Sequence, residues 1–199
     1  MKNVVIYIHG KYGTAEEAEY YKKFFNEADI IGFKYTSEYP WDFQKEFSNF
    51  IENIYAKYKK ISIIANSIGA YFTMLSLTNK NIEKAFFISP IVDMEKLITD
   101  MMVSENITEE ELYKKKEIKT SFGETLSWDY LTFVRKNPIE WNVPTYILYG
   151  EKDNLTSYEM ILNFTNKSKA NLTIMKGGEH WFHTDEQIEF LNNWIKNLA

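Results

Sequence analysis

Cysteine is absent from this chain of 199 residues. That absence excludes a disulfide framework, a thiolate metal site and a cysteine nucleophile together. Histidine is nearly as scarce, since the three histidines lie at positions 9, 180 and 183 and form no His-x-x-x-His pair. We therefore expect no metal site. Residues 10–13 have too few glycines for a phosphate-binding loop or a dinucleotide fingerprint, so we also expect no cofactor.

Basic residues are also fewer than acidic residues. The chain has 23 Lys and Arg against 28 Asp and Glu, which gives a net charge of -5. Nucleic-acid and anionic-membrane surfaces need a basic patch, so we expect neither partner. No apolar run has the length of a membrane span, and the run at 4–8 is too short for the core of a signal peptide. We expect a soluble cytoplasmic protein whose partner is a small molecule.

Short apolar runs alternate with amphipathic segments along most of the chain. The length favours a single domain, residues 1–199, with a sizeable core. Because parallel neighbours need a helical crossover, the alternation predicts an α/β fold with a doubly wound, mostly parallel six-stranded sheet. We expect the six strands at 4–8, 30–35, 61–64, 85–88, 145–149 and 172–175.

One region breaks this alternation. Residues 91–143 show no clear strand, but they carry glutamates at 109–111 and lysines at 114–116 behind a predicted helix cap at Thr108. The two charge runs balance each other, which is typical of a solvated helix face. We interpret the region as a small helical insertion within the domain.

The segment 60–79, KISIIANSIGAYFTMLSLTN, passes directly from a predicted strand into a predicted helix, with Ser67 at the bend. A nucleophile elbow has this form, and its neighbours must be small because the strand and helix backbones pass close together. Gly69 fits that pattern, whereas Ala65 stands where glycine is usual. The alternative interpretation is a serine that only caps the helix.

Two further polar residues follow predicted strands. Asp153 comes after the strand at 145–149, and His180 comes after the strand at 172–175. In open α/β sheets the carboxyl ends of the strands form the ligand site. A serine hydroxyl needs a base to take its proton, and an imidazole base needs a carboxylate to fix its tautomer. We predict that Ser67, Asp153 and His180 form a catalytic triad.

The order serine, aspartate, histidine at these strand ends resembles the α/β-hydrolase superfamily. More narrowly, the chain is similar to small single-domain bacterial serine hydrolases of the lysophospholipase and monoacylglycerol-lipase type, over residues 4–198 and without the first two strands of larger members. The resemblance implies a sheet order of 2-1-3-4-5-6 for the expected strands. It also implies an oxyanion hole made by the backbone N–H groups of Lys11 and Ile68, and a cap at 91–143.

The implied activity is hydrolysis of a carboxylic ester or a related acyl substrate through an acyl-enzyme intermediate. Amide, thioester or C–C bond hydrolysis on the same triad is the alternative within enzymes. A catalytically silent binding module with the same fold is the alternative outside them.

Several site assignments have competitors. Asp93 follows the strand at 85–88 and competes with Asp153, which could itself be only a turn residue. His183 competes with His180, but it directly precedes the predicted helix cap at Thr184. In the resembled family His9 orders the oxyanion loop. We also expect aromatic residues to wall an apolar pocket, with ordinary packing as the alternative for each: Tyr12, Tyr39, Trp41, Trp128, Tyr130 and Trp181.

Overall fold

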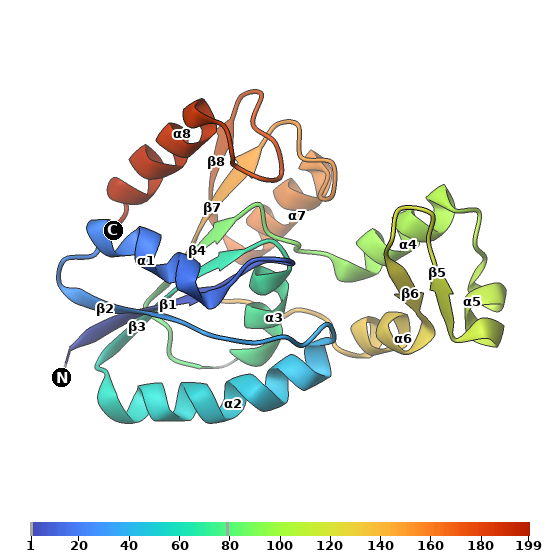
Figure 1. Cartoon of the computed structure of the whole chain (residues 1–199), viewed down its shortest axis with the longest axis horizontal. Helices are drawn as coiled ribbons and strands as arrows, with labels where there is room; N and C mark the ends of the chain where they lie inside the picture. The colour runs from blue at the N-terminus through green and yellow to red at the C-terminus, as the bar shows by residue number, and fades with distance from the viewer. Residues whose placement is uncertain (1, 79) are drawn as a thin grey trace. The chain divides into compact units, whose positions relative to one another are not determined.

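The computed structural model describes residues 2–78 and 80–199 (Figure 1). Met1 and Asn79, the last residue of the predicted strand-and-helix segment 60–79, lie outside the described residues. The chain forms two compact units. The first unit comprises Met1–Val92 and Glu140–Ala199, and the second unit comprises Asp93–Ile139.

A six-stranded sheet is the centre of the first unit. Its order is β2-β1-β3-β4-β7-β8, and every neighbouring pair runs parallel. This is the predicted α/β architecture and the predicted strand order. The strands are β1 (Asn3–Ile8), β2 (Ala28–Gly32), β3 (Lys60–Asn66), β4 (Lys84–Ile88), β7 (Thr145–Gly150) and β8 (Asn171–Met175).

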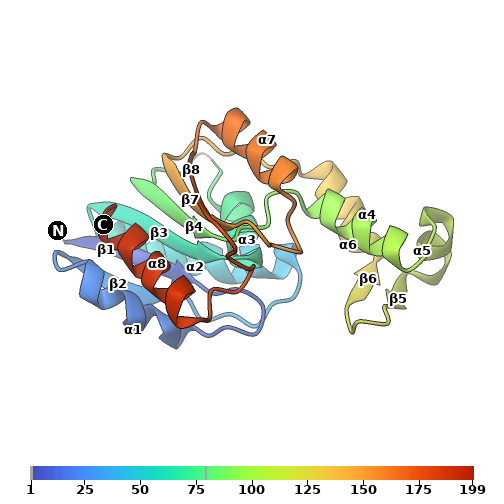
Figure 2. The ribbon, with the colours of Figure 1, turned by 90° about the horizontal axis from the view of Figure 1, so that it is seen from above.

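Helices cover both faces of this sheet, as the two perpendicular views show (Figures 1 and 2). One face packs against α1 (Ala18–Tyr21) and α8 (Asp185–Lys196). The other face carries α2 (Pro40–Lys57) and α3 (Ile68–Ser76), which contact each other. The remaining elements of the unit are α7 (Tyr158–Ser168) and the short 3-10 helices η1 (Ala15–Glu17) and η2 (Lys22–Phe24).

The sequence pattern explains these layers. The central strands are nearly continuous apolar runs because helices bury them from both sides, and Ile6, Ile63 and Phe86 are completely buried. In α2 the buried side chains recur at helical spacing from Phe43 to Ile54, and Pro40 occupies the first turn, where its missing N–H has no helical acceptor to lose.

Some local predictions are wrong. The strand predicted at 30–35 begins at Ala28 and ends at Gly32, where a side chain would collide with the backbone of Ala15, since a Cβ there would lie 1.9 Å from the Ala15 carbonyl oxygen. The predicted caps at Thr108 and Thr184 are confirmed. Thr156 and Glu159 have capping-box spacing, which predicts a cap at Thr156, but the N-cap of α7 is Ser157.

The second unit consists of α4 (Met94–Ser104), α5 (Glu109–Lys115), a hairpin of β5 (Glu117–Lys119) and β6 (Thr125–Ser127), and α6 (Trp128–Lys136). We expected no strand in this region. Each strand has only three residues, which is too few for an alternating pattern to be visible. Whether this unit acts as a cap stays a prediction.

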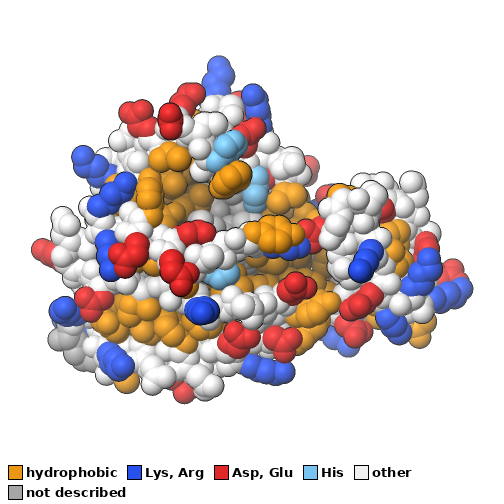
Figure 3. All heavy atoms as spheres, in the orientation of Figure 1, with side chains coloured by type: hydrophobic (Ala, Val, Ile, Leu, Met, Phe, Trp, Pro, Cys, Tyr) orange, Lys and Arg blue, Asp and Glu red, His pale blue; other side chains and the backbone are white. Residues whose placement is uncertain are grey.

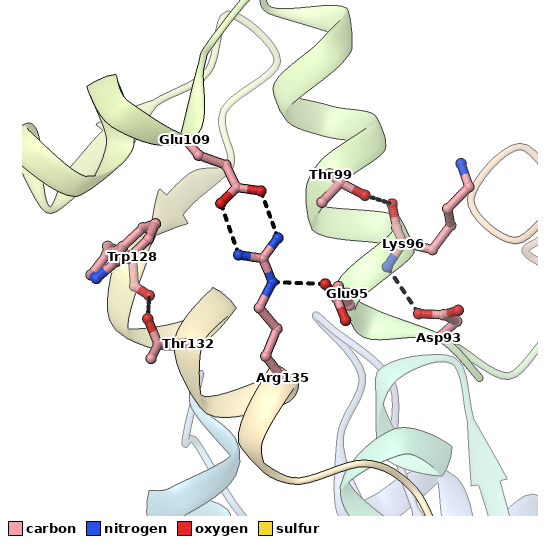
Figure 4. A network of polar contacts seen from close by, with 8 residues as sticks. All are labelled: Asp93, Glu95, Lys96, Thr99, Glu109, Trp128, Thr132 and Arg135. Carbon is pink, nitrogen blue, oxygen red and sulfur yellow. Dashed lines mark hydrogen bonds and ion pairs between the residues drawn. The ribbon is translucent and has the colours of Figure 1, made fainter.

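One arginine joins the three helices of the second unit (Figure 4). From α6, the Arg135 guanidinium donates two hydrogen bonds, of 2.8 and 2.6 Å, to the Glu109 carboxylate and one of 2.7 Å to Glu95. Such a planar fork pairs bidentately with a carboxylate. The pairing raises the pKa of Arg135 and lowers the pKa of Glu109. Among the described residues, no helix of either unit could cross a membrane.

Candidate active site

Ser67 lies at a sharp, strained bend between β3 and α3. Its backbone angles are φ 50° and ψ -121°, a conformation that non-glycine residues rarely adopt and that is often retained at functional sites. As the N-cap residue of α3 it makes no side-chain capping hydrogen bond. The interpretation of Ser67 as only a capping serine is therefore wrong, and its hydroxyl is available for another partner.

The small residues around the bend have a steric cause. A Cβ on Gly69 would lie 2.4 Å from the carbonyl oxygen of His9, because the start of α3 passes directly over the end of β1. Ala65 is completely buried in β3, and its methyl group is tolerated where the family pattern has glycine. The local geometry is the tight strand-to-helix turn that the sequence predicted, the form that a nucleophile elbow has.

The Ser67 hydroxyl meets an imidazole. The distance from Ser67 Oγ to His180 Nε2 is 2.9 Å, and the distance from His180 Nδ1 to Asp153 Oδ2 is 2.7 Å. The carboxylate can only accept, so Nδ1 carries the proton and Nε2 is left as the acceptor for the serine hydroxyl. The arrangement can move a proton away from Ser67.

Asp153 is more deeply buried than His180 and has further hydrogen-bond partners. Its side chain is fully buried, whereas that of His180 is 16% exposed. Besides the bond to His180, its Oδ1 accepts from the backbone N–H groups of Leu155, at 2.8 Å, and Thr156, at 3.0 Å. Three donors thus converge on one carboxylate, as a buried anion requires.

Gly150 also brings the loops of Asp153 and His180 together. A Cβ on Gly150, at the end of β7, would lie 2.5 Å from the carbonyl oxygen of Glu179. The Lys152 N–H donates to the carbonyl oxygen of Gly178 at 2.7 Å. The turn that carries Asp153 is therefore seated directly against the loop that carries His180.

Both predicted oxyanion donors flank the serine. A Cβ on Gly10 would lie 3.2 Å from the Ser67 Cβ, so the chain reaches Lys11 directly beside the elbow. Ile68 is the first residue of α3, where backbone N–H groups have no acceptor within the helix. His9 stacks on Tyr35 at 4.1 Å, and the Tyr35 hydroxyl donates to the His9 carbonyl oxygen at 2.7 Å. The loop after β1 is held in place by these contacts.

The competing residues have other partners. Asp93 caps α4 and accepts from the Lys96 N–H at 2.9 Å (Figure 4). The His183 backbone N–H donates to Gln187 Oε1 at 3.1 Å, ahead of α8. Asp93 and His183 thus make hydrogen bonds at the start of a helix. Asp153 and His180 instead bond to each other.

The aromatics predicted to line a pocket come from both units, and their shared role stays a prediction. Tyr12 and Trp181 are 89% and 74% exposed and lie in the two loops that also hold Lys11 and His180. Figure 3 shows histidine side chains reaching the surface beside hydrophobic side chains. Trp41 stacks on Tyr39 at 4.7 Å.

Two of the expected aromatics, Trp128 and Tyr130, belong to the second unit. There Trp128 packs edge-on against Tyr113 at 5.2 Å. A surface hollow of about 540 Å³ lies elsewhere in the first unit, between Lys22, Phe25, Asp29 and Tyr58. In the part of the chain that the structure describes, no three His, Asp or Glu side chains gather as metal ligands would.

Sequence reasoning missed a set of hydrogen-bonded side chains that begins next to Ser67, at Asn66. The Tyr7 hydroxyl contacts both Asn66 and Glu17. The one available signal was a tyrosine inside the otherwise aliphatic run at 4–8.

Comparison with known proteins supports the same architecture. No protein family and no curated protein matched the sequence. Among solved structures, Est1E from Butyrivibrio proteoclasticus superposes with a TM-score of 0.79 at 18% identity, over 99% of this chain and 86% of that one. A putative hydrolase from Agrobacterium vitis gives 0.78 at 16% identity, over 99% and 88% of the two chains.

A lipase-esterase related protein from Clostridium acetobutylicum gives a TM-score of 0.66 at 17% identity, over 99% of this chain and 94% of that one. At these identities the likeness is one of fold. The chain has the α/β-hydrolase fold, as the sequence predicted.

Proposed function

We propose that this chain of α/β-hydrolase fold is a serine hydrolase that cleaves a carboxylic ester or a related acyl substrate through an acyl-enzyme intermediate. The observation that carries the proposal is the unbroken hydrogen-bond relay, 2.9 Å from Ser67 to His180 and 2.7 Å from His180 to Asp153. Its donors and acceptors have the polarity that activates a serine nucleophile.

The reaction then runs in two halves. Ser67 Oγ attacks the substrate carbonyl carbon while His180 Nε2 takes the hydroxyl proton, and Asp153 stabilises the resulting imidazolium. The leaving group departs with the proton from Nε2. Water, activated by the same nitrogen, releases the acid from Ser67 in the second half.

Charge on the carbonyl oxygen develops in both halves. The backbone N–H groups of Lys11 and Ile68 receive that charge in the proposed mechanism. Removing one donor of this kind lowers kcat by about 10²- to 10³-fold in serine hydrolases. General base catalysis contributes about 10²- to 10⁴-fold.

The exposed faces of Tyr12 and Trp181 favour a substrate with an apolar or planar acyl group. A structure of Est1E has been solved with ferulic acid bound, and it superposes on this chain with a TM-score of 0.75 at 17% identity. Aromatic acyl esters therefore belong in the first substrate panel, beside p-nitrophenyl esters of increasing chain length.

Labelling with a fluorophosphonate probe tests the nucleophile directly. We expect the wild type and Ser48→Ala, a control on the exposed face of α2, to label, and Ser67→Ala not to label. If Ser67→Ala labels as well as the wild type, the nucleophile is wrong.

The substrate panel separates the remaining possibilities. Turnover of amides or thioesters but not of esters would reassign the substrate within the same mechanism. A wild type that neither labels nor hydrolyses any of them would favour a binding module.

We also propose that the second unit is the cap of this enzyme. Replacing Asp93–Ile139 by a short linker tests the idea. We expect the variant to keep fluorophosphonate labelling but to lose its preference among chain lengths. An unchanged preference among acyl chain lengths would contradict the proposal that the second unit is a cap.

A further inference from the structure

The side chains of Glu17, Tyr7 and Asn66 form a hydrogen-bonded chain next to the elbow. The mechanism above does not use this chain. The Tyr7 hydroxyl donates to Glu17 Oε2 at 2.5 Å and accepts from Asn66 Nδ2 at 2.9 Å. The other carboxylate oxygen of Glu17 accepts from the Thr14 backbone N–H at 3.0 Å. Tyr7 is therefore the junction between Glu17 and Asn66.

The ends of this chain reach the two segments that carry the proposed oxyanion donors. Asn66 directly precedes Ser67 and Ile68 at the elbow. Glu17 holds the end of the loop that contains Lys11: a Cβ on Gly13 would lie 3.0 Å from Glu17 Oε1. One chain of hydrogen bonds thus runs from Asn66, beside the elbow, to Thr14, at the end of the loop that contains Lys11.

Backbone pairing does not extend as far as these donors. The ladder between β1 and β3 ends with the pair Ile8 and Ala65. Beyond that pair the loop and the elbow stay in close contact at Gly10, and the side chains of Glu17, Tyr7 and Asn66 add a hydrogen-bonded link between them. The spacing of the two N–H groups then depends on this bridge as well as on the sheet.

The position of Tyr7 is informative because the side chains packed around it are mostly apolar. Tyr7 is completely buried in β1, within a cluster that includes Val5, Ile64 and Phe86. A phenylalanine there would fill the same space without a hydroxyl that must be satisfied. Burial raises the pKa of Tyr7, with help from the neighbouring Tyr21 and Glu17, so its hydroxyl keeps the proton it donates.

We propose that Tyr7 is a positioning residue of the hydrolase, and that its hydroxyl sets the spacing of the Lys11 and Ile68 N–H groups by joining Glu17 to Asn66. This inference rests on the proposed function. An oxyanion hole stabilises the transition state through donors placed 2.7–3.1 Å from the oxyanion, and a misplacement of about 1 Å can lower the rate by about 10²-fold. Substrate binding in the ground state depends less on those donors.

Tyr7→Phe keeps the ring and removes the junction. We expect kcat for a p-nitrophenyl ester to fall about 10- to 100-fold, KM to stay within about twofold, and fluorophosphonate labelling of Ser67 to slow in parallel. Phe47→Leu is the control for lost stability, because Phe47 is equally buried but lies in α2. We expect it to lower the melting temperature and leave kcat unchanged.

Substitutions of Glu17 provide a second test of the proposal. Glu17→Ala should lower kcat as Tyr7→Phe does, whereas Glu17→Gln, which keeps an acceptor oxygen, should restore most of the activity. Because both residues act through one bridge, the double variant Tyr7→Phe/Glu17→Ala should be no slower than the slower single variant.

The inference is overturned if folded Tyr7→Phe keeps the wild-type kcat, if only its KM changes, or if the effects of the two single variants multiply. Failure of the proposed function gives a different result, since the wild type itself would then neither label nor turn over ester. In that case no oxyanion hole exists for Tyr7 to position, and the inference falls with the function.

Discussion

The fully buried carboxylate of Asp153 holds the His180 imidazole through a hydrogen bond of 2.7 Å. Because this bond fixes the tautomer, Asp153→Asn should leave Nδ1 as the acceptor and Nε2 protonated, which is the wrong polarity for activating Ser67. We expect kcat to fall about 10³- to 10⁴-fold in steady-state assays.

Asp93→Asn is the matched control for this change. Asparagine is as good an N-cap as aspartate, so the variant should match the wild type in both activity and stability. A large loss of kcat in Asp93→Asn, with little loss in Asp153→Asn, would reverse the assignment of the acid.

At the elbow, adding a methyl group at Gly69 and removing one at Ala65 should both lower stability but should affect activity differently. Gly69→Ala forces a Cβ to within 2.4 Å of the His9 carbonyl oxygen, so we expect a loss of about 2–3 kcal/mol in the free energy of unfolding, together with lost activity. Ala65→Gly removes a buried methyl group and should destabilise by about 1 kcal/mol while activity persists.

Urea unfolding and ester hydrolysis measure both effects of these substitutions. A Gly69→Ala protein as stable and active as the wild type would contradict the close approach of α3 to β1.

Arg135 makes the stability of the second unit depend on pH. Its hydrogen bonds lower the pKa of Glu109 below the ordinary value, so the pair stabilises the protein above that ordinary value and stops doing so as the pH falls through the lowered one. Glu109 is 50% exposed, and solvent screening limits the contribution to about 0.5–1 kcal/mol.

The measurement compares wild type and Arg135→Gln by urea unfolding at about pH 7 and about pH 3. The stability difference should shrink at the lower pH. Lys114→Gln, which removes only an exposed pair with Glu110, should change stability by less, at about 0.3–0.5 kcal/mol. A difference that grows on acidification would contradict the role of Arg135.

Trp181 offers a test of the substrate surface. Its side chain is 74% exposed and stacks on His183 at 4.6 Å, so Trp181→Ala should change stability by less than about 0.5 kcal/mol. We expect KM for aromatic acyl esters to rise about 3- to 10-fold, with a smaller effect on acetyl esters. Equal effects on both ester classes would exclude a contact with the acyl group.

The sheet could be predicted because each strand is a short apolar run that ends at a turn or a polar residue. Ser67, Asp153 and His180 could be grouped for the same reason, since each follows a strand of a parallel sheet. The distances within the group could not be predicted, because these depend on the close approach of backbones at Gly69 and Gly150.

Other features left no readable pattern. The β5–β6 hairpin is too short for periodicity, and the choice between Thr156 and Ser157 as a cap depends on tertiary structure: the Thr156 hydroxyl donates to the Pro90 carbonyl oxygen at 3.3 Å. The link from Glu17 through Tyr7 to Asn66 joins residues far apart in the sequence. Such a link is visible only once β1 and β3 are side by side.

The strand that leads to His180, β8, is an edge strand of the sheet. β8 is hydrogen-bonded to β7 alone, whereas β3, which leads to Ser67, has a neighbour on each side. Edge elements open locally at lower free energy than central ones. Brief fraying of this edge would withdraw His180, the proposed base, while Ser67 stays in place. Mild denaturant should therefore abolish turnover before the protein as a whole unfolds.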